Sequence, residues 1–484
     1  MTGLNIRPVL YVIGIMLTIE AVAMLAPMLA DLAVGNRDWL VFGISAAVTL
    51  FFGVLLMLTN WTPSTPLHLR QIFVLTTLVW AVVCLFGALP FMFADIDLDL
   101  ADAFFESMSG LTTTGSTVIV GLDRLPPGLL LWRSILQWLG GIGIIGMGIA
   151  VLPFLRVGGM QLFRSESSDR SDKVLPRAGD QAVALGQIYL LLTIGCIAAL
   201  IAAGMSVFDA VCHAMTTVST GGFSTHDASA GHFGNPLIEW ILVLFMALGG
   251  MPFVRYISIL NANVRPLWRD TQVRWYIGFL ATISLVLGGW LSWTGDVPFA
   301  DAIRSASFNV VSVVTTTGFA TEDYGLWGPL AVVAFLVLTL VGGCTGSTSG
   351  GIKIFRFEIL FKALHALMAR LVSPNRIIPL AYDGKPVDSD VMISVMAFGF
   401  VFVAGTMLVA MILAAMGLDA ITAISGAATA FANVGPGLGP IIGPVGNFAT
   451  LPVAAKWLLS LSMLLGRLEF FTVLVLLNPR FWIR

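Results

Sequence analysis

Four short peptides rich in hydroxyl side chains and glycine recur along the chain, each between two long apolar runs. In chain order they are Thr112–Gly115, Ser219–Phe223, Thr315–Phe319 and Ala432–Gly435. An Asp-Ala pair precedes each peptide, with its aspartate at position 102, 209, 301 or 419. The shared glycines at positions 115, 222, 318 and 435 are 107, 96 and 117 residues apart, and this spacing predicts one structural unit repeated four times.

The composition limits where such a repeat can fold. Of 484 residues, 57% are hydrophobic and only 11% are charged, which excludes a set of soluble domains. Apolar runs of nearly 20 residues recur, long enough to cross a hydrocarbon layer of about 30 Å. The net charge of −2 and the lack of a Lys/Arg block give no indication of nucleic-acid binding. Neither the four cysteines nor any other residues have metal-ligand spacing, and no disulfide framework is expected.

The order of long and short apolar segments predicts an all-α polytopic membrane protein. Two opening spans, Val9–Ala30 and Trp39–Leu58, lie outside the repeat, and the first is expected to be retained rather than cleaved as a signal peptide. Each unit then has a long, a short and a long segment. The predicted long spans are Gln71–Phe93, Leu129–Phe154, Ala182–Met205, Leu237–Leu260, Trp275–Trp293, Leu326–Val341 with its continuation, Val391–Met416 and Leu451–Leu477.

The short segments cannot cross the membrane, so we expect them to enter it as re-entrant helices and return as the glycine peptides. These segments are Ala103–Thr113, Ala210–Thr220, Ala302–Thr316 and Ala420–Asn433. The expected fold therefore has ten full spans and four re-entrant segments, arranged as four pseudo-symmetric units around a central pore. The predicted divisions are two N-terminal helices in 1–66 and pore units in 67–160, 161–265, 266–385 and 386–484, with a cytoplasmic linker at 155–180.

The distribution of basic residues predicts the orientation. With the N-terminus in the cytoplasm, 19 of the 25 lysines and arginines fall in predicted cytoplasmic stretches. Acidic turns such as Asp95–Asp102 fall on the outer side, as the positive-inside rule favours. The basic segments Leu155–Asp180 and Lys353–Lys385 offer a charged surface for a cytosolic partner.

Non-helical backbone at membrane depth is tolerated only where protein buries it or water reaches it. Four such peptides on one side can converge on an axis, where a ring of carbonyl oxygens replaces the hydration shell of a monovalent cation. The preceding helices would point their negative ends at the ion. For a single copy, a capped helix end is an equally good interpretation, but four copies in register favour the carbonyl ring.

The four long–short–long units, with one glycine per peptide, resemble the Trk/Ktr/HKT family of potassium transporters. The two extra N-terminal spans and three sequences, S-T-G-G-F-S-T-H (219–226), V-V-T-T-T-G-F-A-T (313–321) and N-V-G-P-G-L-G-P (433–440), resemble its bacterial TrkH-type branch. The resemblance implies a potassium-selective pore in the bacterial inner membrane, with K⁺ as the transported ion and no organic cofactor. It also implies a homodimer regulated by a cytosolic nucleotide-binding ring of the TrkA type.

The resemblance further implies that each glycine and the two residues before it form a K⁺ selectivity filter. These residues are Thr113, Thr114, Gly115, Thr220, Gly221, Gly222, Thr316, Thr317, Gly318, Asn433, Val434 and Gly435. The fourth copy departs from the pattern, because Asn433 and Val434 replace hydroxyl residues and leave only the backbone role.

A glycine-rich segment interrupts the last span of the third unit. It consists of Gly342, Gly343, Cys344, Thr345, Gly346, Ser347, Thr348, Ser349, Gly350 and Gly351. Five glycines in ten residues cannot hold a helix, since each costs about 1 kcal/mol relative to alanine. A phosphate loop is disfavoured because Ile352 precedes Lys353 and no strand leads in. A kinked helix is one alternative, and the resemblance implies a flexible gating loop across the pore.

Arg467 lies inside the last apolar span. An intramembrane arginine is costly and should face protein or water, which makes it a functional candidate. The alternatives are a pair with Glu469 or extension to the membrane surface. The resemblance implies an arginine in the pore beneath the filter. We therefore expect Arg467 to donate hydrogen bonds to the 342–351 loop and to help hold it closed.

Two other classes of function remain in view. An ion-coupled secondary transporter, using H⁺ or Na⁺ in symport, also contains repeats and broken helices, although four parallel repeats disfavour it. An intramembrane hydrolase would need a nucleophile and a base, for which Ser347 or Ser349 with His365 is the one weak candidate. His213 and His226, which flank the second glycine peptide, are expected to be hydrogen-bonded structural residues.

Overall fold

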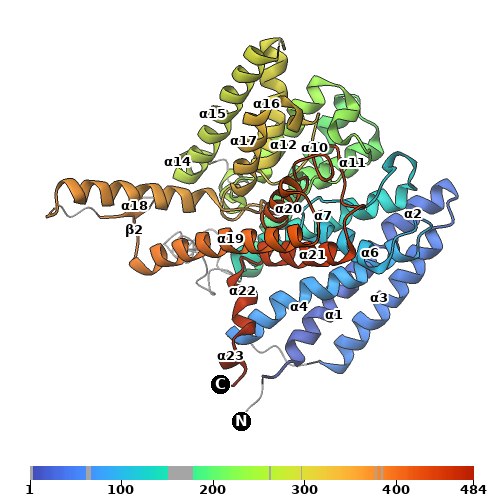
Figure 1. Ribbon diagram of the computed structural model, residues 1–484. Helices are drawn as coiled ribbons and strands as arrows, with labels where there is room; N and C mark the ends of the chain where they lie inside the picture. The colour runs from blue at the N-terminus through green and yellow to red at the C-terminus, as the bar shows by residue number, and fades with distance from the viewer. Residues whose placement is uncertain are drawn as a thin grey trace.

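The fold is helical and matches the expected class (Figure 1). The structure, a computed structural model, describes residues 4–61, 67–150, 178–260, 263–295, 297–375, 379–382 and 385–483. Within these ranges seven helical segments are long and apolar enough to cross a membrane, and two sharply bent pairs bring the number to nine. Most of the linker at 155–180 lies outside the described residues, and the predicted unit boundaries remain predictions.

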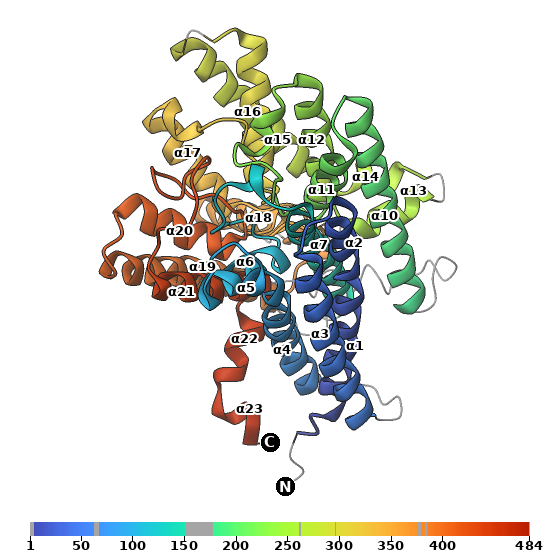
Figure 2. The same cartoon turned by 90° about the vertical axis from the view of Figure 1, so that its right-hand side faces the viewer.

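The two opening spans stand beside the first unit. The first consists of α1 (Arg7–Ala23) and α2 (Leu25–Val34), and the second is α3 (Trp39–Thr59). Helix α1 packs against α3 and against α4 (Leu69–Gly87) of the first unit. Figure 2 shows these three helices side by side, below most of the repeat units.

Each unit contains one short helix that precedes its glycine peptide. These helices are α6 (Leu100–Leu111), α11 (Val207–Val218), α16 (Phe299–Val314) and α20 (Ala420–Ala432). The first membrane-length helix of the first unit is α4. Its counterparts in the second, third and fourth units are α10 (Ala178–Ala202), α15 (Thr271–Thr294) and α19 (Ser389–Ala415). The helices that follow the peptides are α7 (Pro127–Ala150), α12 (Pro236–Gly249), α17 (Pro329–Leu340) and α21 (Val453–Arg467).

Shorter elements connect these helices. The helical ones are α5 (Leu89–Phe93), η1 (Leu122–Arg124), η2 (Ser229–Phe233), α13 (Phe253–Leu260), α14 (Arg265–Arg269), η3 (Tyr324–Trp327), α18 (Ile354–Val372), α22 (Phe471–Leu474), η4 (Val475–Leu477) and α23 (Pro479–Ile483). Strands β1 (Ala381–Tyr382) and β2 (Lys385–Pro386) pair antiparallel, with Ala381 opposite Pro386.

The packing of the units is cyclic. The helix after each glycine peptide contacts the short helix of the next unit, so α7 packs on α11, α12 on α16 and α17 on α20. Helix α21 of the fourth unit then packs on α6 of the first. The four short helices are therefore held in a closed order, and their C-terminal peptides are brought to one central region.

Two of the ten predicted full spans are sharply bent. Helices α12 and α13 meet at 101°, where Gly249 and Gly250 are followed by Pro252, which has no N–H to continue the helix. Helix α21 meets the segment Phe471–Leu477 at 103°, and Glu469 and Phe470 adopt left-handed φ values of 59° and 51° there. The last span of the third unit is interrupted, as expected, between α17 and α18.

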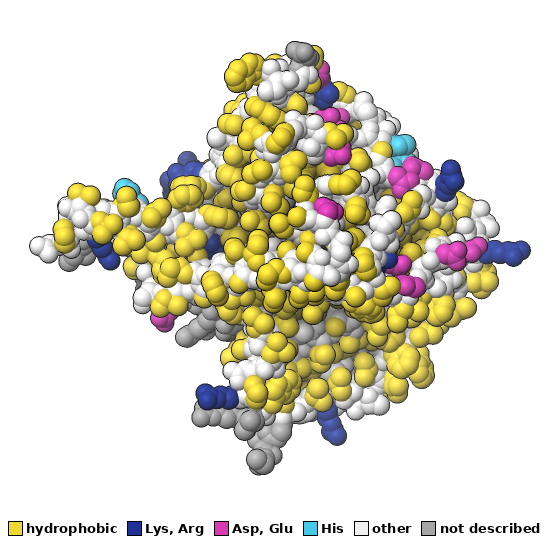
Figure 3. All heavy atoms as spheres, viewed as in Figure 1, with side chains coloured by type: hydrophobic (Ala, Val, Ile, Leu, Met, Phe, Trp, Pro, Cys, Tyr) yellow, Lys and Arg dark blue, Asp and Glu magenta, His cyan; other side chains and the backbone are white. Residues whose placement is uncertain are grey.

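Apolar side chains cover much of the surface, which fits a protein embedded in lipid. Figure 3 shows hydrophobic atoms over most of the visible face, with many of the charged groups near its edges. Helix α18 extends away from the body on the left of Figure 1. Its exposed apolar residues include Phe361, Leu364 and Met368, which recur at helical spacing.

Candidate functional site

The four short helices end in the same backbone conformation. The residue two positions before each glycine has a positive φ, which is uncommon outside glycine. These φ values are 52° at Thr113, 52° at Thr220, 59° at Thr316 and 56° at Asn433. The glycines themselves have φ values of 87° at Gly115, 79° at Gly222, 84° at Gly318 and 110° at Gly435. The departure of the fourth peptide in sequence therefore does not alter its backbone.

Equivalent hydrogen bonds close each helix end. In every peptide, the amide just before the glycine donates to the carbonyl five residues earlier. The N···O distances are 2.8 Å for Thr114 to Ser109, 2.8 Å for Gly221 to Thr216, 2.8 Å for Thr317 to Ser312 and 3.1 Å for Val434 to Thr429. These bonds satisfy helix carbonyls that would otherwise lack a donor at the C-terminus.

The glycines face carbonyl oxygens of the neighbouring peptides in a closed order. A Cβ added to Gly115 would collide with the oxygen of Gly221, one on Gly222 with that of Thr317, and one on Gly318 with that of Val434. A Cβ on Gly435 would lie 2.9 Å from the oxygen of Thr114, which returns the series to the first peptide. Only glycine fits this close backbone approach at a positive φ. We call each of these glycines together with the two residues before it, twelve residues in all, the glycine ring.

Several polar side chains fix the glycine ring by hydrogen bonds. Gln137 on α7 donates from Nε2 to the Gly221 oxygen at 2.7 Å and accepts from the Phe223 amide at 3.0 Å. Between the first and fourth peptides, Ser116 Oγ donates to the Gly435 oxygen at 2.8 Å. Asn433 Nδ2 likewise donates to Thr114 Oγ1 at 2.9 Å. Nothing in the sequence indicated Gln137 or Ser116, because their importance depends on contacts between units.

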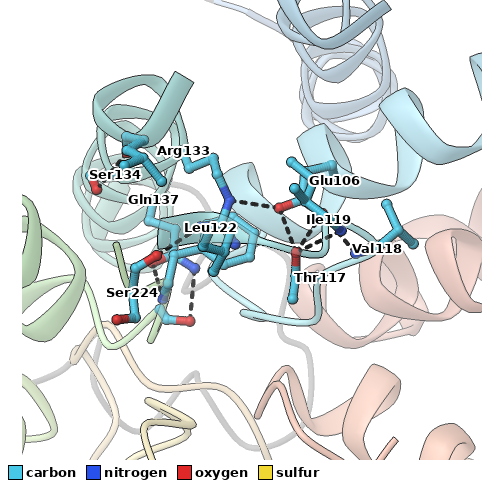
Figure 4. Close-up of polar contacts among 12 residues, drawn as sticks. Glu106, Thr117, Val118, Ile119, Leu122, Arg133, Ser134, Gln137 and Ser224 are labelled. Carbon is cyan, nitrogen blue, oxygen red and sulfur yellow. Dashed lines mark hydrogen bonds and ion pairs between the residues drawn. The ribbon is translucent and has the colours of Figure 1, made fainter. Parts of the chain in front are cut away.

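A buried ion pair supports the first two peptides (Figure 4). Arg133 Nε lies 2.8 Å from Glu106 Oε1, and both side chains are buried. Glu106 also accepts from the Val118 amide, while Arg133 Nη1 donates to the Ser224 oxygen, at 2.9 and 2.8 Å. The pair joins segments that follow Gly115 and Gly222.

The 342–351 loop lies directly against the glycine ring. Ser349 Oγ donates to the Thr315 oxygen at 2.7 Å, and the Gly350 amide donates to Thr316 Oγ1 at 2.7 Å. Thr348 Oγ1 accepts from Thr220 Oγ1 at 3.1 Å. A Cβ on Gly350 would collide with the Ala432 oxygen. The loop therefore contacts the second and third peptides and the residue before Asn433 of the fourth.

Arg467 makes the expected contact with this loop. Its Nη1 donates to the Thr348 oxygen at 2.9 Å, and the side chain is 3% exposed. The alternative pair with Glu469 does not form, because Glu469 contacts Arg356 at the start of α18 instead. Arg467 Nε and Nη2 have no acceptor among the described residues. A buried guanidinium held by one carbonyl is thus placed beside the loop.

A small cavity lies between the loop and the end of α21. Its volume is about 30 Å³ and it is lined by residues of the loop together with Lys353, Gly466, Arg467 and Glu469. The cavity has room for at least one water.

The hydrolase alternative finds no support among the described residues. Ser347 Oγ donates to the Cys344 oxygen at 2.6 Å, and Ser349 Oγ is bonded to a backbone oxygen as described above. His365 lies exposed on α18 and contacts neither hydroxyl. His213 has the structural role that was expected, since its ring nitrogens lie 2.9 Å from the Asp209 oxygen and 3.0 Å from Ser224 Oγ.

Comparison with known proteins supports the resemblance found in the sequence. The family model of TrkH, described as a cation transport protein, matches residues 40–482. The potassium uptake protein TrkI of Halomonas elongata is 48% identical over 98% of this chain and 96% of its own length. TrkH of Escherichia coli is 37% identical over 99% of this chain and its entire length.

The fold agrees with that of a solved relative. The crystal structure of the potassium transporter TrkH from Vibrio parahaemolyticus superposes with a TM-score of 0.91 at 37% identity, covering 99% of this chain and all of that one. The relatives are named as transporters, not enzymes. With nearly the full length matched, the chain belongs to the TrkH family of cation transport proteins, which are multi-span membrane proteins.

Proposed function

We propose that this protein mediates potassium uptake across the bacterial inner membrane, with the glycine ring as its selectivity filter. The names of its relatives support the substrate, and the closed order of glycines and carbonyl oxygens is the observation that carries the site. Positive φ values at alternate residues turn successive carbonyls toward one side of each peptide. Four such peptides supply the oxygen ligands that replace the hydration shell of K⁺.

The hydrogen bond from Gln137 to Gly221 is compatible with this role. A carbonyl oxygen has two lone pairs, so the Gly221 oxygen can accept from Gln137 and still contribute to ion binding. The bond fixes the carbonyl direction before an ion arrives. A pre-positioned ligand favours K⁺ over the smaller Na⁺, because the ring does not contract to meet the smaller ion.

We infer that the 342–351 loop and Arg467 form the gate and that the structure is closed. The loop is hydrogen-bonded to the second and third peptides, and the nearby guanidinium repels cations. Opening requires the loop to leave its bonds with Thr220, Thr315 and Thr316. The link between Arg356 on α18 and Glu469 at the α21 bend offers a route by which movement of α18 reaches this region.

Selectivity after a change at Gly318 tests the filter. In Gly318→Ser, the side chain collides with the Val434 oxygen, so we expect sodium permeation to rise relative to potassium. The matched control is Gly399→Ala on α19, where an added Cβ meets nothing within 4 Å. Purified chains in liposomes, assayed by rubidium and sodium flux, give the ratio directly. Wild-type discrimination in Gly318→Ser would refute the filter assignment.

We also propose a homodimer that binds a cytosolic TrkA-type ring. The exposed apolar face of α18 suits a second copy, and Lys362 and Arg370, unlike the buried Lys353 and Arg356, are accessible to a charged partner. Bismaleimide should cross-link Leu364→Cys to a dimer but leave Phe51→Cys on α3 monomeric. The four native cysteines are buried and should not interfere. A monomer in both variants would contradict the α18 contact.

A further inference from the structure

Three side chains with metal-binding atoms gather beyond the glycine ring. The ligand atoms of Asp123, His226 and His232 all lie within 4.8 Å of one another. Asp123 Oδ1 is 2.5 Å from His226 Nδ1, and the two imidazole rings are stacked with centroids 3.5 Å apart and planes 3° from parallel. The sequence did not suggest this group, since Asp123 and His226 are separated by 103 residues.

An ion pair alone accounts for only part of this arrangement. It explains Asp123 and His226, and the bond to His226 lowers the pKa of the Asp123 carboxyl. It does not explain His232, which has no hydrogen-bond partner in the part of the chain that the structure describes. His226 Nε2 is buried and also lacks a hydrogen bond, although Asp209 Oδ1 lies 3.5 Å away. Imidazole nitrogens without partners are therefore concentrated beside a carboxylate.

The backbone around the cluster is well fixed by loops from three units. Asp227 Oδ1 accepts from the amides of Gly121 and Leu122 at 3.0 and 3.1 Å, which joins the loop after Gly115 to the loop after Gly222. On the other side, the Gly231 amide donates to the Ala320 oxygen at 3.1 Å. The loops are held while the three side chains, which are partly or largely exposed, have room to turn.

We propose that Asp123, His226 and His232 form a binding site for a divalent transition-metal ion such as zinc. Two imidazoles and one carboxylate are preferred zinc ligands, with bonds of about 2.0–2.2 Å. Tetrahedral ligands at that distance lie about 3.3 Å apart, so side-chain rotations that move the present atoms by about 1.5 Å suffice. Water or Asp209 completes the coordination. The bound ion ties the loop after the first glycine peptide to the loop after the second.

Cobalt(II) gives a direct test because its visible absorption reports nitrogen and oxygen ligands in tetrahedral geometry. The full-length chain, purified without a polyhistidine tag, should bind one equivalent of Co²⁺ that zinc displaces. His232→Ala removes one ligand and should therefore weaken binding at least about tenfold. The double variant with His226→Ala and His232→Ala should abolish the spectrum. The matched control is His365→Ala, on the exposed surface of α18, which should bind as the wild type does.

Two results would overturn the proposal. One is a wild-type chain that gives no saturable cobalt spectrum, and the other is equal binding by the double variant. Elution volume and metal-free rubidium uptake, expected to be unchanged in His232→Ala, show that the variant is folded. Asp123→Asn provides a second measure, since it retains the shape of the side chain but removes its charge and should weaken zinc binding.

An effect of zinc on transport is expected because the cluster joins loops that continue from the glycine ring. Zinc should slow rubidium uptake by the wild type and leave His232→Ala unaffected, an expectation that rests on the proposed function. A cobalt spectrum without any zinc effect on uptake would contradict the coupling to the ring. A chain that binds cobalt but never transports rubidium would instead contradict the proposed function.

Discussion

Replacing Arg467 should increase ion flux in the absence of any partner. In Arg467→Ala, the charge-assisted hydrogen bond to the Thr348 oxygen is lost, and a buried bond of this kind stabilises by about 1.5–3 kcal/mol. If that energy favours only the closed state, the ratio of open to closed channels rises about 10- to 150-fold. Rubidium uptake into liposomes containing the purified chain measures the change.

A double variant tests whether the loop and Arg467 form one barrier to ion flow or two separate ones. Deleting Thr345–Ser349 removes the acceptor for Arg467 and should also raise flux. Since both changes disrupt the same contact, the combined variant should gain much less than the two single gains together. Arg467→Lys keeps the charge but not the guanidinium geometry and should be intermediate. Additive gains would show that loop and arginine act separately, and lower flux in Arg467→Ala would place the arginine in the conduction path.

The supports of the glycine ring give two further predictions. Glu106→Ala leaves Arg133 buried without its partner and should reduce the free energy of unfolding by about 3–5 kcal/mol. A lower thermal unfolding temperature in detergent would reveal this loss. An unchanged temperature would contradict a structural role for the pair. Gln137→Leu removes the bonds to Gly221 and Phe223 and should cost about 1–3 kcal/mol in the positioning of the second peptide. We expect lower K⁺/Na⁺ discrimination with the fold retained, and unchanged discrimination would show that the Gly221 carbonyl keeps its position without Gln137.

The features predictable from sequence were those with a local signal. Membrane-length apolar runs indicated the spans, and the repeated hydroxyl–glycine peptides indicated where four short helices end. The interruption at 342–351 followed from the intrinsic cost of glycine in a helix. The contact between this loop and Arg467 was predictable because each has polar groups that need partners at membrane depth.

The features that were missed depend on contacts between distant segments. The bend at Glu469 and Phe470 has no glycine or proline of its own, and Phe470 packs there against Phe398, Phe402 and Phe431. Tertiary packing therefore outweighs the preference of that run for a straight helix. The group of Asp123, His226 and His232 was similarly invisible, because two loops from different units must pack together before its members meet.

The cyclic packing order has a consequence for how the chain is made. Helix α6 needs α21 as its neighbour, yet the ribosome synthesises α21 more than 300 residues later. Until then, one side of α6 and the polar peptide after it face the bilayer or the insertion machinery without their final partner. Truncation at about position 450, which removes α21, should therefore affect the first unit as severely as the fourth. The N-terminal half cannot reach its native state as an independent domain, and quality control of the nascent chain must wait for its end.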